Sequence, residues 1–449
     1  MSLRPFDRIT PFQVIIMGFI LLISLGTALL LLPISTRAPG GAPLIDALFT
    51  AVSASCVTGL ILHDTAQYWS SFGQGVILSL IQIGGMGVVT IGLAVFMLSG
   101  RKISLKQRWI MQESISAPQV GGIVRQMRFI LYFSCLIELL GMVPLAIRFC
   151  SEMGPGLGLW YAVFHSISAF CNAGFDLMGI HGPAFASLTA FKSDPIVQLT
   201  ICFLIISGGL GFLTWQDIRT QKYRLHRYRL QSKLVLATTF FLLLGGALFF
   251  FFCEFCLSHW NSLNTSEKIL AALFHSTTTR TAGFNTVDLS LLSPPGQLLT
   301  ILLMLIGGSP GSTAGGFKIT TLAVLLLSSR AVFQRKPHAQ CFGRRISDDV
   351  LRNASAIFML YLVLFFTGGV LICCIDGIPL MGAMFEAASA IGTVGLSLGY
   401  TPILSTASHL ILIFLMYFGR VGGLTMIYAV MSHDAHVVSQ LPEEYVFVG

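Results

Sequence analysis

Residues 44–60 read LIDALFTAVSASCVTGL, and this stretch decides how the rest of the 449-residue chain is interpreted. It begins with apolar residues, continues with small and hydroxylated ones, and reaches a glycine at position 59. Three further stretches align with it: 159–175 (LWYAVFHSISAFCNAGF), 269–284 (ILAALFHSTTTRTAGF) and 380–396 (LMGAMFEAASAIGTVGL). In each, a glycine follows a phenylalanine after nine or ten residues, and successive glycines are 115, 109 and 112 positions apart. The chain therefore contains a fourfold internal repeat.

Long apolar segments flank each of these stretches. The chain is 54% hydrophobic and only 10% charged, which leaves too little polar surface to coat a water-soluble globule of this size. Eight segments approach the roughly 20 apolar residues that cross a bilayer. We expect these spans to be centred in 11–33, 75–99, 129–149, 195–215, 234–256, 297–328, 353–375 and 407–431. The first is too long for the core of a secretory signal and no small-residue cleavage site follows it, so we interpret it as a retained helix.

The repeat and the spans together predict an all-α integral membrane protein with eight transmembrane helices and four re-entrant pore loops. Each repeated stretch is only about 12–16 residues long, enough for a half-span helix that enters the membrane and returns. Non-helical backbone at membrane depth is tolerated only where protein buries it or where it lines a watery cavity. Four such loops therefore predict one shared cavity with pseudo-fourfold symmetry. The alternative is a set of amphipathic helices on the outer surface, which would need basic polar faces that these stretches lack.

The repeats divide the chain into four helix–pore loop–helix units. Their predicted bounds are 1–100, 101–218, 219–330 and 331–449, the last including the C-terminal tail.

The distribution of basic residues predicts the orientation in the membrane. Of the 27 Lys and Arg residues, 20 lie in the N-terminal tail and in 101–128, 219–233 and 330–352, which are at every second junction between spans. The positive-inside rule then predicts that both termini and these three loops are cytoplasmic. Because the basic residues follow the membrane topology, the net charge of +8 does not indicate that the chain binds nucleic acid. The basic loops could dock a partner protein, or only set the topology and contact anionic lipids.

The ends of the four repeated stretches predict a site for a monovalent cation. Glycine reaches backbone angles that other residues avoid, which lets successive carbonyl groups point the same way. Four such strands around an axis would present rings of carbonyl oxygens that replace the hydration shell of an ion, and TVG at 393–395 is a fragment of the potassium-filter signature. The short helices would aim their partially negative C-terminal ends at the cavity, which favours cations. The predicted filter residues are Val57, Thr58, Gly59, Asn172, Ala173, Gly174, Thr281, Ala282, Gly283, Thr393, Val394 and Gly395.

Two carboxylates and a cysteine pair near these stretches need an interpretation. Asp176 follows the second filter strand and Glu386 lies early in the fourth short helix, so each could modulate the outer mouth or be an ordinary satisfied polar group. The repeats hold no cage of Asp and Glu, as a divalent cation would prefer. Cys253 and Cys256 form a CxxC pattern without a second pair or a nearby His cluster, so we expect no metal or redox site there.

With these blocks in view, the chain resembles the TrkH/KtrB/HKT superfamily of potassium transporters, whose members carry four pore-loop units in one polypeptide. The resemblance extends from Leu32-Pro33-Ile34-Ser35-Thr36 to the FGRVGGLT stretch at 418–425, and the compact length is most similar to the bacterial KtrB membrane subunit. It implies that the four aligned glycines are the filter glycines. It also implies channel-like potassium uptake across a bacterial inner membrane, a homodimer, and a ring of cytosolic nucleotide-binding subunits similar to KtrA. The implied substrate is the potassium ion, no cofactor is implied in this chain, and sodium stays open as an activator.

The segment 307–316, GGSPGSTAGG, interrupts the sixth apolar span, since Gly and Pro both disfavour a helix interior. The resemblance implies that it is an intramembrane gate loop just below the filter. Its predicted gate residues, with two nearby cations, are Gly307, Gly308, Ser309, Gly311, Ser312, Thr313, Gly315, Gly316, Lys318 and Arg420. A charge within a span costs roughly 2.5–3.5 kcal/mol on insertion scales, so it usually has a function. We expect Arg420 to hydrogen-bond loop carbonyls and oppose cation passage, whereas Lys318 could instead extend to the cytoplasmic edge.

No chemistry of an enzyme is predicted. The chain has neither a GxxxxGK[ST] phosphate loop nor an HExxH zinc motif, and His433 with His436 lies in the tail without further ligands. The main alternative is a secondary symporter that couples potassium entry to sodium or protons. Such a carrier needs intramembrane carboxylates, which are few here, and Glu138 is the clearest.

Overall fold

The computed structural model describes residues 10–92, 105–114, 121–180 and 182–430, and every statement on the fold refers to these residues. They are mostly helical, and their strands form a single short hairpin of β1 (Gln340–Cys341) and β2 (Arg344–Arg345). Four helices are long and apolar enough to cross a membrane. They are α1 (Pro11–Leu30), α7 (Ile123–Met153), the helix Leu230–Glu254 and α15 (Asp348–Asp376). The third consists of α11 (Leu230–Phe249) and a terminal π-helical turn, Phe250–Glu254. These four match the predicted first span of each repeat.

The second apolar segment of each repeat is short or broken. These helices are α4 (Ser71–Met86), α9 (Pro195–Gly209) with α10 (Phe212–Gln221), α13 (Pro294–Leu305) with α14 (Ile319–Phe333), and α17 (Thr406–Val421) with α18 (Gly423–Val430). The axes of α9 and α10 differ in direction by 94°, and they could count as a fifth span only if the pair is taken together. The predicted spans 75–99, 195–215 and 407–431 are therefore interrupted helices within the described residues, and 93–99 and 431 lie outside these. The predicted break in 297–328 is present.

One backbone conformation explains three of these breaks. Gly87, Gly211 and Gly422 have φ of 89°, 81° and 91°, with ψ of 131°, 145° and 137°. A side chain at such angles meets steric strain, so glycine is the residue that can end one helix and start the next here. Because apolar residues flank each glycine, the sequence pattern is that of a continuous helix and does not predict the interruption.

The four repeated stretches form short, buried helices. They are α2 (Leu44–Ser55), α8 (Pro155–Phe170), α12 (Thr265–Thr278) and α16 (Leu380–Gly392). Pro43 and Pro379 precede α2 and α16, and Asn264 with Glu267 forms a capping box at the start of α12. We call these four the pore helices.

The helices that follow the pore helices begin at side-chain caps. The capping residues are Ser70 of α4, Asp194 of α9, Ser293 of α13 and Ser405 of α17, and each accepts a hydrogen bond from an amide in the first turn of its helix. Such a cap satisfies amide groups that the helix itself leaves unpaired. The same device therefore starts the second helix in all four repeats.

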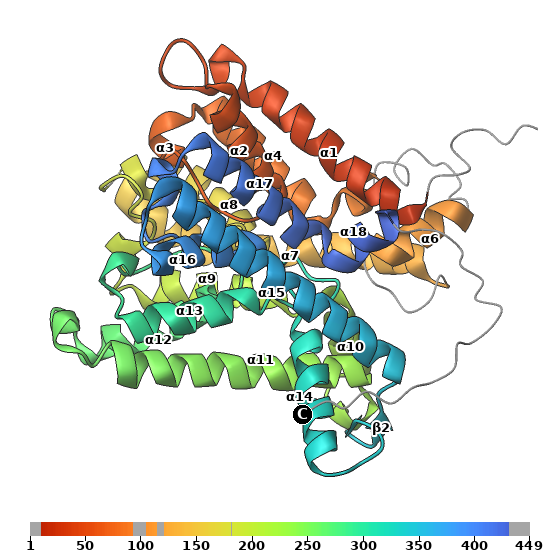
Figure 1. Cartoon of the computed structure of the whole chain (residues 1–449). Coiled ribbons are helices and arrows are strands. Elements are labelled where there is room, and N and C mark those ends of the chain that lie inside the picture. Colours follow the sequence, from red (N-terminus) through yellow and green to blue (C-terminus); the bar gives the residue numbers. More distant parts are fainter. Residues whose placement is uncertain (1–9, 93–104, 115–120, 181, 431–449) are drawn as a thin grey trace, which may run out of the picture.

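Burial in this molecule is inverted relative to a water-soluble protein. The pore helices, rich in Ala, Ser and Thr, lie inside, whereas the long apolar helices are only 28–33% buried within their most apolar windows. In Figure 1, α1 and α11 run along opposite edges with the pore helices α2, α12 and α16 between them. Large exposed apolar faces are stable against lipid, so the chain is a multi-pass membrane protein.

The remaining elements connect these helices. They are α3 (Thr65–Tyr68), α6 (Leu105–Ser114), which packs on α1 and α7, and short 3-10 turns at Pro33–Ser35, Met178–Ile180, Thr189–Phe191, Leu225–Arg227, Ser258–Trp260, Leu289–Leu291 and Thr401–Ile403.

Candidate functional site

The strands that follow the four pore helices meet in a closed ring. A Cβ placed on Gly59 would collide with the carbonyl oxygen of Ala173, and each of the other three glycines stands in the same relation to the next repeat. The corresponding pairs are Gly174 with Ala282, Gly283 with Val394, and Gly395 with Thr58. The order runs from repeat one through repeat four and back to one. Four equivalent carbonyl oxygens therefore lie at the contacts between adjacent strands, and no side chain larger than hydrogen fits there.

Each filter strand contains two residues in the left-handed region. The filter glycines have φ of 92°, 68°, 86° and 93° in repeats one to four. The residue two positions earlier is left-handed as well: Val57 (57°), Asn172 (60°), Thr281 (69°) and Thr393 (50°). A β-branched residue in this region is a genuine outlier, and such strain concentrates at functional sites. Sequence reasoning anticipated the glycines but not these partners, because Val and Thr ordinarily avoid positive φ.

A hydroxyl of each pore helix holds the filter strand of the same repeat. The Oγ of Ser53 accepts from the amide of Gly59 at 3.1 Å, and the Oγ of Ser389 accepts from Gly395 at 3.0 Å. In the other two repeats the hydroxyl donates to the carbonyl after the glycine, from Ser168 to Phe175 at 2.7 Å and from Thr278 to Phe284 at 2.6 Å. Sequence reasoning missed these four supports. Their signal is a hydroxyl five or six positions before each filter glycine.

The predicted filter residues have little contact with solvent. The eight that are not glycine are each at most 1% exposed. The hydroxyls of Thr58 and Thr393 have no hydrogen-bond partner in the described part of the chain. Asn172 differs from its counterparts, since its amide donates to the Thr281 hydroxyl at 3.2 Å and so links two neighbouring strands.

A cavity of about 810 Å³ lies on one side of the ring and is lined by all four filter glycines. Its walls come from the loops after the second and third filter strands, from Leu396–Gly399, and from His259 to Leu263. Asp176 lines it too, and its carboxylate accepts from the Met178 amide at 3.0 Å. Burial, the largest cause, raises the pKa of Asp176 to about 7, and the nearby Asp64 carboxylate adds to the rise. We call this cavity the outer vestibule.

The segment between α13 and α14 lies on the opposite side of the ring. Its backbone is anchored to two broken helices: the amides of Ser309 and Thr313 donate to carbonyls at the end of α9, and the amide of Gly316 donates to the Gly419 carbonyl of α17. The Thr313 hydroxyl donates to the Phe170 carbonyl at 3.0 Å, and a Cβ on Gly315 would collide with the Thr393 hydroxyl. The segment therefore touches the inner ends of filter strands two and four.

The two cations predicted to act with this segment both turn toward its carbonyls. Arg420 donates through Nη1 to Thr313 and through Nη2 to the carbonyls of Gly84 and Gly85, the latter at 2.8 Å. Nζ of Lys318 donates to the Ala314 carbonyl at 2.6 Å, so this side chain is directed at the segment and not at a membrane edge. Arg420 lies in the last turn of α17, next to the break at Gly422, and not in the middle of a long span.

The other predicted gate residues all belong to this segment. Gly307 is bonded through its amide to Phe317, and Gly308 accepts from Ile319, so the two ends of the segment run side by side. Gly311 accepts from the Phe212 amide, and the Ser312 hydroxyl donates to the Ser309 carbonyl at 2.6 Å.

Glu386, whose role the sequence left open, and Glu138, the clearest carboxylate for a symporter, are both hydrogen-bonded within the protein. Glu386 is fully buried and accepts from the Ser397 hydroxyl, the Leu398 amide and the Thr401 hydroxyl, so it fixes the chain just beyond Gly395. Both carboxylate oxygens of Glu138 accept from Nε2 of Gln82, at 3.0 and 3.1 Å. Neither lines the outer vestibule.

Other residues of reactive or metal-binding types do not form a catalytic or metal site in the described part of the chain. The stretch 395–399 reads GLSLG, a match to the GxSxG pattern, but its serine donates to Glu386 and lies on no strand-to-helix turn. Cys253 and Cys256 are exposed and unpaired. Within the described ranges, no group of three or more His, Cys, Asp or Glu residues could hold a metal ion. His433 and His436 lie outside the described residues.

Comparison with known proteins gives matches over nearly the entire chain. Residues 2–438 match the family model described as "TrkH: Cation transport protein". The "Potassium/sodium uptake protein NtpJ" of Enterococcus hirae is 38% identical over 460 residues, covering 100% of this chain and 99% of that protein. The "Ktr system potassium uptake protein B" of Bacillus subtilis is 39% identical, with 98% of this chain and 97% of that protein covered.

A solved structure shares the fold. The potassium transporter TrkH from Vibrio parahaemolyticus superposes with a TM-score of 0.74 at 18% sequence identity, covering 96% of this chain and 87% of that one. At this identity the likeness concerns the architecture alone.

Proposed function

The chain belongs to the TrkH family of cation transport proteins, and from this premise we propose that it takes up potassium through a pore closed by the segment 306–318. The family and the relatives named above are transporters, not enzymes. The observation that carries the proposal is the closed ring of the four filter glycines, with four equivalent carbonyl oxygens at its joints.

Selection of the ion rests on main-chain oxygens. A potassium ion enters from the outer vestibule and exchanges its water for carbonyls of the four filter strands. The pore helices end next to these strands, so their partially negative ends stabilise a cation at that point. The hydroxyls of Ser53, Ser168, Thr278 and Ser389 keep the strands from relaxing, which a filter for one ion size requires.

The gate in this proposal is the segment 306–318, named the gate loop from here on. It touches the inner ends of two filter strands, and its contacts with α9 and α17 would hold it in place. Arg420 and Lys318 fix its carbonyls and add positive charge below the filter, which opposes cation passage. The loop must leave for an ion to pass.

The membrane arrangement follows from the four repeats. We propose eight spans, with the broken second segments counted as spans, and four re-entrant pore loops in a bacterial inner membrane. Both termini and the β1–β2 hairpin would be cytoplasmic. The Bacillus subtilis relative is named as part of a Ktr system, which supports a cytosolic nucleotide-binding subunit ring as the regulator and a homodimer of the membrane subunit. A sodium ion as activator belongs to the same proposal.

The alternative, a symporter that couples potassium to sodium or protons, has less support. A coupled carrier needs a titratable or ion-binding carboxylate in the path. Glu138, the clearest candidate, is held by Gln82 between α4 and α7 and does not line the outer vestibule.

The experiment that tests the function is flux of potassium, rubidium and sodium through the purified protein in liposomes. We expect potassium to move only down its electrochemical gradient, and replacement of each filter glycine by Ser to reduce the preference for potassium over sodium. Gly245→Ser is the matched control, because a Cβ at this position of α11 meets nothing within 4 Å. Potassium accumulation against its gradient would favour the symporter, and unaltered ion preference in all four variants would remove the filter assignment.

A further inference from the structure

Arg280 carries a buried guanidinium group that the proposed pore does not use. It follows α12 and directly precedes Thr281 of the third filter strand. Its side chain is 8% exposed, and its Nε has no hydrogen-bond partner. In the part of the chain that the structure describes, no carboxylate pairs with it, whereas Arg420 has three carbonyl partners. Buried charges in proteins are normally paired or hold a ligand, so this one calls for a counter-charge.

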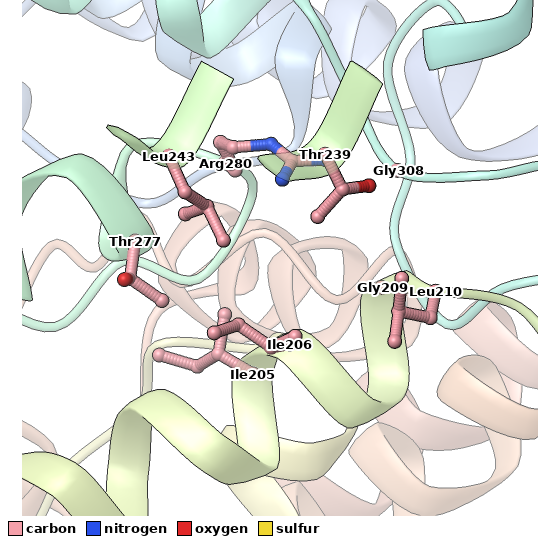
Figure 2. Close-up of a pocket in the computed structure, with 9 residues that line it drawn as sticks. All are labelled: Ile205, Ile206, Gly209, Leu210, Thr239, Leu243, Thr277, Arg280 and Gly308. Atoms are coloured by element: carbon pink, nitrogen blue, oxygen red, sulfur yellow. The ribbon is translucent and has the colours of Figure 1, made fainter. Parts of the chain in front are cut away.

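A small cavity lies beside this guanidinium group. It has a volume of about 10 Å³ and lies between α9, α11, the end of α12 and the gate loop. Its lining includes Thr239, Thr277, Arg280 and Gly308 of the gate loop. In Figure 2 the guanidinium group extends across the cavity toward Thr239 and Gly308. This volume has room for one particle of roughly the size of a water molecule.

Besides Arg280, one polar side chain at the cavity is a donor without an acceptor. Thr239 is a buried residue, and its hydroxyl forms no hydrogen bond with the described residues. The hydroxyl of Thr277, in contrast, already donates to the Leu273 carbonyl at 2.8 Å. The remaining walls are mostly apolar side chains. A guanidinium group and a hydroxyl donor in such surroundings favour an anion and repel a cation, and the small volume favours a small anion.

We propose that this cavity binds one monatomic anion such as chloride, held by the Arg280 guanidinium group and the Thr239 hydroxyl. The anion neutralises the positive charge behind the third filter strand, which would otherwise disfavour a potassium ion at Thr281. A water molecule would satisfy the donors but would leave the charge uncompensated.

The test measures chloride binding to the full-length purified protein in detergent by the line width of the ³⁵Cl NMR signal. The wild-type chain should broaden the signal, and added bromide should reverse the broadening because both halides compete for one site. Arg280→Gln should abolish the competable broadening. Arg148→Gln is the control, since Arg148 lies at the surface in ion pairs with Asp194 and Glu152, and it should keep the wild-type broadening.

A second variant keeps the test decisive if Arg280→Gln does not fold. Thr239→Val keeps the guanidinium group and the shape of the side chain, and it should weaken chloride binding about tenfold because a hydrogen bond to a charged partner is lost. The proposal is overturned if the wild-type chain shows no competable broadening, which would mean that the cavity holds water only. It is overturned as well if both variants bind chloride like the wild type. Halide binding is independent of potassium flux, so this result and the test of the pore can fail separately.

Discussion

At the scale of single residues, the proposed filter depends on hydroxyl groups that come from its own helices. Ser389 accepts from the Gly395 amide at 3.0 Å and is fully buried. Its removal leaves a buried amide without a partner, which costs about 1–3 kcal/mol. The strand can then relax away from the geometry that distinguishes ions of different size.

We therefore expect Ser389→Ala to lower the preference for potassium over sodium about tenfold in liposome flux, while total protein and oligomer size stay unchanged. Ser79→Ala is the matched control. Its hydroxyl donates to the Gly75 carbonyl on an exposed face of α4, so its loss should leave selectivity intact. Equal selectivity of the two variants would show that the hydroxyl does not support the filter.

Arg420 gives a second prediction at this scale. It donates to the gate loop at Thr313 and to the end of α4 at Gly84 and Gly85, so it joins the loop to a different repeat. Each hydrogen bond from a charged group contributes about 1.5–3 kcal/mol. Arg420→Ala should release the loop and raise potassium flux severalfold in the absence of any regulatory subunit.

The control for Arg420→Ala is Arg219→Ala. Arg219 lies on α10 over the ring of Phe129 and has no contact with the gate loop. Flux of Arg420→Ala that matches that of the control and the wild type would contradict the gating role. A lower flux would indicate that Arg420 positions the filter and not a barrier.

At the scale of elements, the breaks in the second helices give each repeat a corner at membrane depth. Gly422 separates α17 from α18, and a Cβ there would meet only the Thr425 hydroxyl, at 4.0 Å. The cost of a side chain at this position is therefore one of backbone conformation and not of collision. For an L-residue at these backbone angles the cost is about 1–3 kcal/mol.

Gly422→Ala should lower the free energy of unfolding by about this amount and thereby lower the thermal unfolding midpoint of the purified protein. Gly245→Ala, inside the regular helix α11 with open space around it, should raise the midpoint slightly, because Ala stabilises a helix interior by about 1 kcal/mol relative to Gly. A midpoint for Gly422→Ala at or above that of the wild type would show that the break is not maintained by the left-handed glycine.

At the scale of the whole molecule, the fourfold ring forms only if all four pore helices enter from the same side. The basic loops then lie on the opposite side, which the positive-inside rule makes cytoplasmic. Two exposed residues probe this arrangement: Ser290 on the rim of the outer vestibule, and Phe342 in the β1–β2 hairpin.

A membrane-impermeant maleimide added to intact cells should label Ser290→Cys and spare Phe342→Cys, which should react only after lysis. Labelling is counted as the excess over the parent chain, because ten native cysteines are present. Labelling of Phe342→Cys alone in intact cells would show the orientation opposite to the proposed one. Labelling of both variants would exclude a single orientation.

The sequence by itself determined the class of the protein, the fourfold repeat and the family. Apolar content, span length and the spacing of four glycines are local properties, and membrane insertion makes them decisive because lipid tolerates little else. The family prediction is confirmed by the match over residues 2–438 and by the relatives at 38% and 39% identity. The non-helical segment in 297–328 could be predicted for the same reason, since a run of Gly and Pro acts on the backbone where it stands.

Only the tertiary structure decided which atoms meet. The left-handed φ of Val57 and Thr393 depends on strain that packing imposes. The hydroxyl supports and the contact of Glu386 with the loop after Gly395 join residues close in the sequence, but which donor meets which acceptor depends on the path of the strand. The breaks at Gly87, Gly211 and Gly422 were hidden because a glycine between apolar residues is compatible with a helix until packing selects its positive φ. Arg280 likewise looks like any outer-loop cation in the sequence, and its isolation is visible only once the surrounding helices are in place.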